Sequence, residues 1–318
     1  MAALDRRSVD LGPAAPDVNR QGFWATVRAY VSMTKPRIIE LLLVTTVPTM
    51  ILAAGGWPEL STMIAVIVGG SLAAGGASTF NSVYDRDIDR LMERTAHRPV
   101  ASGRISAPAG LAFGAVLSVL SLLVLWIFTN PLATLLAAVA IIAYAVGYTI
   151  LLKRHTAQNI VWGGAAGCMP VLIGWAAVTG DLTWAPVALF AVVFFWTPPH
   201  YWPLSLRYRE DYLAAGVPML PVLASPRIVM RHIAVYSALM IGASIALIWL
   251  APMGPVYTIT AVVLGVLFLA EVGRLWVNVA RGVQDPAPMR LFHGSITYLA
   301  VLFLAVGIDP FVGTAVVG

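Results

Sequence analysis

The chain has 318 residues, of which 59% are hydrophobic and 11% charged, and its mean hydropathy is +0.83. So much apolar sequence excludes a soluble globular enzyme and predicts an all-α polytopic membrane protein. The net charge of +5 does not indicate nucleic-acid binding, because the basic residues lie in short segments between apolar runs, as in the loops of membrane proteins.

The N-terminal residues 1–22 are polar and include Pro13 and Pro16. This composition favours a disordered cytoplasmic leader over a signal peptide. Lys35 and Arg37 then flank Pro36 just before the first apolar run. We interpret these basic side chains as anchors at the level of the lipid headgroups.

At about 20 residues per crossing, the apolar runs predict nine transmembrane helices. Their expected ranges are 38–55, 61–80, 109–128, 132–152, 158–178, 183–199, 232–250, 255–276 and 290–308. The turns after the odd-numbered spans lack Lys and Arg, whereas the other connections, the N-terminus and the adjoining span ends hold all 20 of these residues. This distribution predicts a cytoplasmic N-terminus and an external C-terminus. We expect one membrane domain over residues 23–310 and an external tail over 311–318.

A highly charged stretch, residues 81–99, directly follows the second predicted span. If that helix continues, Asn81, Asp85 and Asp89 are spaced at i, i+4 and i+8 and lie on one face. Amide and carboxylate oxygens suit Mg²⁺, which takes one or two carboxylates together with substrate phosphate oxygens. The sequence therefore predicts a magnesium site at this end of the helix.

A basic row formed by Arg86, Arg90 and Arg94 runs beside the acidic residues. Because Pro99 biases the preceding residue toward an extended conformation, Arg94, Arg98 and Arg104 could fold back over a bound anion. Two alternatives remain open, a solvated helix with internal ion pairs and a positively charged loop flank without a ligand.

The fourth predicted span ends with Lys153 and Arg154, and Asn159 begins the next span. The two basic residues are either anion ligands or simple anchors. Asn159 needs a polar partner, because an unpaired amide is costly inside a membrane. Gly163 and Gly167 form a GxxxG pattern, which is typical of close helix packing.

The sixth predicted span ends at Pro198 and Pro199, since two prolines stop or kink a helix. We expect this to leave His200 at the cytoplasmic mouth of the bundle, either as a ligand or as an ordinary interfacial residue. Asp211 is a candidate second metal ligand, provided that this segment and residues 81–99 converge over one cavity.

Three motifs together resemble those of the membrane-embedded UbiA-type prenyltransferases and, within them, the haem-modifying branch of protohaem IX farnesyltransferases. The motifs are Asn81-x3-Asp85-x3-Asp89 with Met92-x-Arg94-Thr-x2-Arg98-Pro99, Tyr148-Thr-x3-Lys153-Arg154-x-Thr156-x2-Asn159, and Trp196-Thr-Pro198-Pro199-His200-x-Trp202 followed by Asp211-Tyr212. Quinone-type relatives usually carry a second Asp-x3-Asp after span six. This chain has Arg207 four residues before Asp211, which favours the haem branch.

The resemblance implies a nine-helix UbiA-type bundle in the bacterial cytoplasmic membrane, with a cavity capped by cytoplasmic loops. It implies transfer of the farnesyl group of farnesyl diphosphate to the 2-vinyl group of haem b, with Mg²⁺ as cofactor. A further expected partner is the downstream haem O oxidase (haem A synthase).

The resemblance also implies roles for individual residues. The expected metal ligands are Asn81, Asp85, Asp89 and Asp211, and the expected diphosphate ligands are Arg94, Arg98, Lys153 and Arg154. Asp85, Asp89 and Lys153 are the expected catalytic residues. Haem binding is assigned to His200 and Asn159.

Two other functions fit part of the sequence. An aromatic prenyltransferase of the quinone or chlorophyll type would share the first motif. A secondary transporter would also carry polar residues in a helical bundle, but its site should lie near the middle of the bilayer. Here the charges cluster at one face, which argues against transport.

Overall fold

The structure is a computed structural model that describes residues 22–312, and these residues form helices and turns without strands. The long helices are α2 (Pro36–Ala54), α3 (Leu60–Tyr84), α5 (Ala107–Phe128), α6 (Pro131–Ile142) with its π-helical continuation η2 (Ala143–Leu152), α7 (Asn159–Thr179), α8 (Trp184–Arg207), α11 (Pro226–Leu250), α12 (Pro255–Ala280) and α13 (Pro288–Val312). The short helices are α1 (Phe23–Met33), α4 (Arg86–Leu91), α9 (Arg209–Ala214) and α10 (Leu220–Leu223). The predicted leader, except for Gly22, and the tail after Val312 lie outside the described residues.

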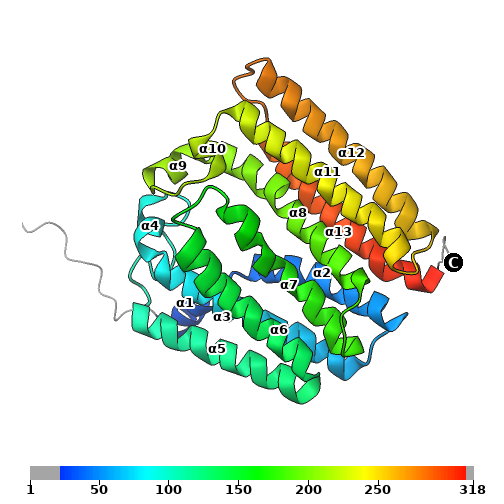
Figure 1. The fold of residues 1–318 in the computed structure, drawn as a ribbon. Helices are drawn as coiled ribbons and strands as arrows, with labels where there is room; N and C mark the ends of the chain where they lie inside the picture. Colours follow the sequence, from blue (N-terminus) through cyan, green and yellow to red (C-terminus); the bar gives the residue numbers. More distant parts are fainter. Residues whose placement is uncertain (1–21, 313–318) are drawn as a thin grey trace, which may run out of the picture.

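The long helices pack side by side as a bundle, with α3 against α5 and α8 against α11 (Figure 1). Eight of them are long and apolar enough to cross a membrane, which confirms an all-α multi-pass membrane protein. Helix α8, at the sixth expected span, is not among the eight, so the count of nine spans and the orientation of the termini stay predictions. In α7, 56% of the apolar window is buried, against 17% in α5. Helix α7 is therefore central, and α5 presents most of its surface outward.

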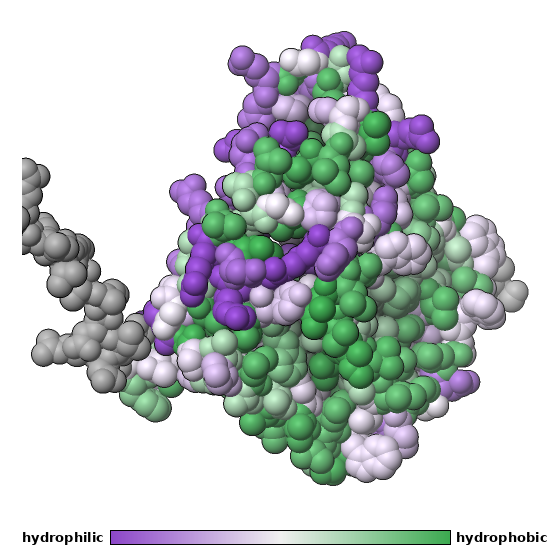
Figure 2. Space-filling model, turned by 60° about the vertical axis from the view of Figure 1, so that its left-hand side comes forward, coloured by the Kyte–Doolittle hydropathy of each residue, from purple (hydrophilic) through white to green (hydrophobic). Residues whose placement is uncertain are grey.

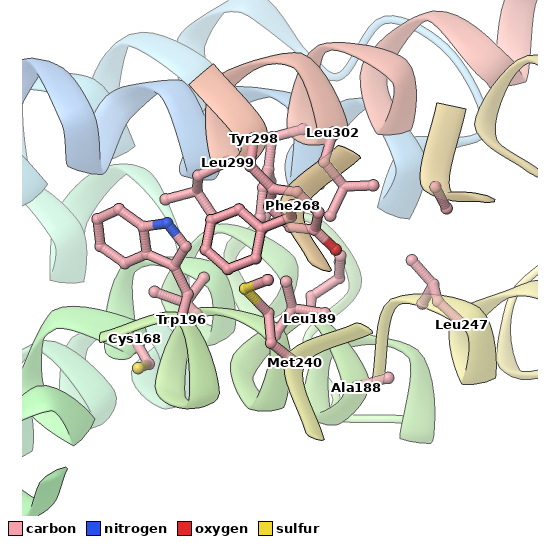
Figure 3. Packing of buried hydrophobic residues seen from close by; sticks show 14 of the residues in the cluster. Cys168, Ala188, Leu189, Trp196, Met240, Leu247, Phe268, Tyr298, Leu299 and Leu302 are labelled. Carbon is pink, nitrogen blue, oxygen red and sulfur yellow. The ribbon is translucent and has the colours of Figure 1, made fainter. Parts of the chain in front are cut away.

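The largest apolar core lies among α7, α8, α11, α12 and α13, where Trp196, Leu189, Met240 and Leu302 interdigitate (Figure 3). A second cluster joins α2, α3, α5, α6 and α7. Helices α3 and α5 approach closely, because a Cβ atom on Gly76 would lie 2.5 Å from Ser118 Oγ and 2.9 Å from Gly114 O.

The prediction that Pro198 and Pro199 end the sixth helix is wrong. The helix passes through Pro198, Pro199 and Pro203 and ends at Arg207. A proline inside a helix costs about 3 kcal/mol, because it removes a backbone hydrogen bond and its ring clashes with the preceding turn. Trp196 and Trp202 on either side are buried in the largest core, and packing against neighbouring helices makes prolines tolerable in membrane helices. The residue after Pro199 therefore lies inside a helix.

The GxxxG pattern of α7 predicted close helix packing at two glycines, and the structure confirms it at Gly163 but not at Gly167. A Cβ atom on Gly163 would lie 2.1 Å from the ring of Tyr148, so this glycine lets η2 approach α7. Gly167 has no atom within 4 Å of its Cβ position and faces open space instead.

Candidate active site

A cavity of about 410 Å³ lies at one end of the bundle. Its walls come from α2, α3, α4, η2, α7, α8, α9 and α13 and from the loop after α4. Hydrophilic side chains gather over the upper part of the molecule in Figure 2, whereas the surface below is largely hydrophobic. The volume falls within the range of small-molecule sites, about 300–1,000 Å³.

The predicted line of oxygen donors turns inward. Helix α3 ends at Tyr84, but the helical hydrogen bonds continue, with Asp85 N–H donating to Asn81 O and Asp89 N–H donating to Asp85 O at 2.9 and 2.8 Å. Asn81, Asp85 and Asp89 are each at most 2% exposed. Burying two carboxylates is costly unless they are paired, and both are.

A basic side chain from another part of the chain holds each of these three predicted metal ligands. Lys35 Nζ donates to Asn81 Oδ1 at 2.7 Å, and Lys153 Nζ donates to Asp85 Oδ2. Arg98 Nη1 donates to both oxygens of Asp89, at 2.9 and 2.8 Å. Three expected oxygen donors are thus surrounded by three basic side chains.

The interpretation of Lys35 as a lipid anchor is wrong, because this residue lines the cavity and contacts Asn81. The residue has φ +54°, a left-handed conformation that is uncommon for a side chain other than glycine or asparagine. Burial of the amine, followed by repulsion from Arg98 and Lys153, lowers the pKa of Lys35 to about 7. Nothing in the local sequence predicts this backbone bend, so the residue was missed as a candidate ligand.

Arg94 and Arg98 both line the cavity, as expected for anion ligands. Arg94 Nη2 donates to Tyr212 Oη at 3.4 Å, and Tyr212 Oη is 3.0 Å from Tyr201 Oη. The Nε of Arg94 is buried without a partner. The segments after α4 and α8 therefore converge over one cavity and leave an unused donor there.

Arg86 and Arg90 of the predicted row, Arg104 and Arg154 all bond to other protein groups. Arg90 Nε donates to Ala101 O at 2.7 Å, and Arg86 Nη1 donates to Val83 O at 2.9 Å. Arg154 makes two 2.7 Å hydrogen bonds to the exposed carboxylate of Asp87. These bonds lower the pKa of Asp87 to about 2. Arg154 Nη2 also lies 3.6 Å from Asp85 Oδ1. Neither Arg154 nor Arg104 lines the cavity.

Three further predicted residues are also absent from the cavity wall. Asp85, fully buried beside Asn81, is one of them. Asn159 is fully buried, and its Nδ2 donates to Thr156 O at 2.8 Å and to Lys153 O at 3.3 Å. It therefore shapes the loop that carries Lys153. Asp211 is only partly buried, and Tyr212 lines the cavity in its place. The roles predicted for Asn159 and Asp211 stay predictions.

His200 lines the cavity from within α8 and not from a turn after it. Its ring stacks between Trp196 and Phe292, with centroid distances of 4.1 and 4.5 Å. The Nδ1 atom is 2.7 Å from Ser295 Oγ.

The residues present fit a magnesium ion in their chemistry. In residues 22–312, no group of three or more His, Cys, Asp and Glu is arranged to hold a metal. The amide of Asn81, however, completes a set of hard oxygen donors with Asp85 and Asp89, and Asp85 Oδ1 is buried without a hydrogen bond. Such a set suits Mg²⁺ and not a soft metal.

Comparison with known proteins extends over most of the chain. The sequence model described as the UbiA prenyltransferase family matches residues 42–296. The protoheme IX farnesyltransferase of Leifsonia xyli is 56% identical over 293 residues, which cover 92% of this chain and 95% of that protein.

Two solved structures share the fold. A digeranylgeranylglyceryl phosphate synthase superposes with a TM-score of 0.74 at 16% identity, covering 90% of this chain and 98% of that one. A UbiA homologue from Archaeoglobus fulgidus, bound to GPP and Mg²⁺, superposes with a TM-score of 0.61 at 18% identity, covering 87% and 99%.

Proposed function

Because this chain belongs to the UbiA prenyltransferase family, we propose that it transfers the farnesyl group of farnesyl diphosphate to the 2-vinyl group of protohaem IX and releases diphosphate. The observation that carries the proposal is a cavity lined both by basic side chains, here called the basic wall, and by aromatic and apolar side chains. The 56% identity to a protoheme IX farnesyltransferase over nearly the whole length supports the choice of substrates.

The basic wall would receive the diphosphate. Lys35, Arg94, Arg98 and Lys153 line this part of the cavity, and arginine pairs well with phosphate oxygens. Cations placed where negative charge develops on the leaving group stabilise the transition state. The apolar part of the lining, which includes Trp196, Leu299 and Val193, would keep water from the allylic cation.

The acidic residues would hold Mg²⁺, as the homologue bound to GPP and Mg²⁺ suggests. Asn81, Asp85 and Asp89 are the proposed ligands, with Asp211 as a helper, and the ion would offset diphosphate charge. In the structure the two carboxylates are paired with Lys153 and Arg98. A diphosphate would compete for these cations and so release the carboxylates, which makes the binding of the two ligands mutually favourable.

We also propose that the cavity opens toward the cytoplasm from the bacterial cytoplasmic membrane, with an external C-terminus. The one-sided Lys and Arg distribution supports this orientation. The product would then pass to a haem O oxidase. A reporter fused after Gly318 should read as external and one fused after Ala107 as cytoplasmic. The same side for both reporters would contradict the orientation.

The test of the reaction is transfer by purified protein. Enzyme with farnesyl diphosphate and Mg²⁺ is given haem b or an aromatic acceptor such as 4-hydroxybenzoate, in separate assays. We expect a farnesylated haem by mass spectrometry and no prenylated aromatic product. The opposite outcome would assign the protein to the aromatic prenyltransferases.

A further inference from the structure

At the cavity end of α8 and α13, aromatic side chains cover both faces of the His200 ring. His200 lies between Trp196 and Phe292, with interplanar angles of 13° and 23°. All three residues line the cavity. Since neither face of the ring is free, His200 can meet a bound molecule only through its edge.

Ser295 determines which edge nitrogen is available. Its hydroxyl donates to Phe292 O at 2.6 Å, and this uses its single hydrogen. The Nδ1 atom of His200, 2.7 Å from Ser295 Oγ, must then be the donor. Ser295 is fully buried, and its backbone O also accepts from Trp196 Nε1 at 2.7 Å. The hydroxyl therefore contacts Phe292 O and His200 Nδ1, while the Ser295 backbone is held by Trp196.

The ring is neutral in this environment. Among the described residues no carboxylate pairs with His200, and burying an unpaired imidazolium is costly. A neutral ring that carries its hydrogen on Nδ1 has its lone pair on Nε2. Histidines that bind metals usually donate their other ring N–H to a neighbouring acceptor, as His200 does.

We propose that Ser295 is a positioning residue that holds His200 as the Nδ1–H tautomer, so that Nε2 is an axial ligand of the iron of the haem substrate. The proposal rests on the proposed function, because the cavity must receive haem. Coordination would place one face of the macrocycle against the edge of His200 and hold the reacting vinyl group in the cavity. It involves no bond cleavage and no change in oxidation state.

The test is a titration of haem into detergent-solubilised protein, followed by the Soret band and by electron paramagnetic resonance of the ferric state. The wild type should give a histidine-ligated spectrum. His200→Ala should lose it, and His200→Gly should regain it when imidazole is added. Ser295→Ala should weaken haem affinity about 10- to 100-fold, as loss of such a partner does at other metal sites, whereas Ser295→Thr should restore both affinity and spectrum.

Ser237→Ala is the matched control. Ser237 is also fully buried, but its hydroxyl donates only to Ile233 O in its own helix at 2.7 Å. Its removal should leave the haem spectrum unchanged. Thermal unfolding of every variant separates loss of ligation from loss of the fold.

The outcomes separate this inference from the proposed function. Wild type that farnesylates haem, with a spectrum identical to that of folded His200→Ala, would overturn the ligation and keep the function. An unchanged spectrum and affinity in Ser295→Ala would overturn the positioning role of Ser295. Wild type that neither binds nor farnesylates haem would overturn both the function and the inference.

Discussion

Two ends of the bundle bury carboxylates by different means. Asp85 and Asp89 are paired with side-chain cations, Lys153 and Arg98. Asp309 near the end of α13 is equally buried, but it accepts backbone N–H groups of Gly254 and Tyr257 at the start of α12. A ligand can displace a flexible side-chain cation but cannot displace a backbone amide fixed in a helix. The partner of a buried carboxylate, more than its burial, therefore separates a binding site from a helix cap.

The largest expected effect on activity comes from neutralising a buried carboxylate at the cavity end of the bundle. We expect Asp85→Asn and Asp89→Asn each to lower transfer at least about 100-fold, in the range found when one electrostatic contact to a transition state is removed. Asparagine keeps the shape of the side chain, so the fold should persist. Activity is measured with saturating Mg²⁺ and normalised to folded protein. More than half of wild-type activity in either variant would refute the metal assignment.

Lys35 offers a sharper test, because Arg37 lies two residues away. Lys35→Met should raise the KM for farnesyl diphosphate about 10-fold, which corresponds to about 1.4 kcal/mol, since the amine lies at the basic wall. Arg37 is exposed, and Arg37→Met should leave KM within about two-fold. Equal effects of the two variants would return Lys35 to its interpretation as an anchor.

At the opposite end of the bundle, Asp309→Ala should lower stability without changing the chemistry. The substitution leaves the backbone N–H groups of Gly254 and Tyr257 unpaired, which costs about 2 kcal/mol. Thermal unfolding in detergent should shift to lower temperature, while kcat per folded molecule stays at the wild-type value. A lower kcat with unchanged unfolding would mean that this end also takes part in the reaction.

The sequence was sufficient for features that depend on composition and helical spacing. Membrane helices follow from apolar length, and the inward line of Asn81, Asp85 and Asp89 follows from the i, i+4 period. Arg94 and Arg98 follow this segment directly and were predicted to fold back over it, and both line the cavity.

Features that depend on one residue of rotation or on a backbone bend could not be predicted. One residue turns a helix by about 100°, and this difference decides that Tyr212 lines the cavity where Asp211 does not. The left-handed backbone of Lys35 redirects a side chain that pattern alone assigns to the surface. The continuation of α8 through Pro198 and Pro199 depends on packing against distant helices, which local propensity does not contain.

The smallest expected effect comes from Asp87, which lies two residues from each buried carboxylate. Its side chain is 61% exposed and pairs with Arg154, and exposed ion pairs contribute only about 0–1 kcal/mol. Arg154 also donates to Tyr84 O at 3.0 Å and stacks over the Tyr84 ring at 4.6 Å, so it should keep its position in Asp87→Asn. We therefore expect transfer activity within about two-fold of wild type. A loss as large as that of Asp85→Asn would show that the exposed carboxylate is also a ligand and that burial does not mark the functional acids of this segment.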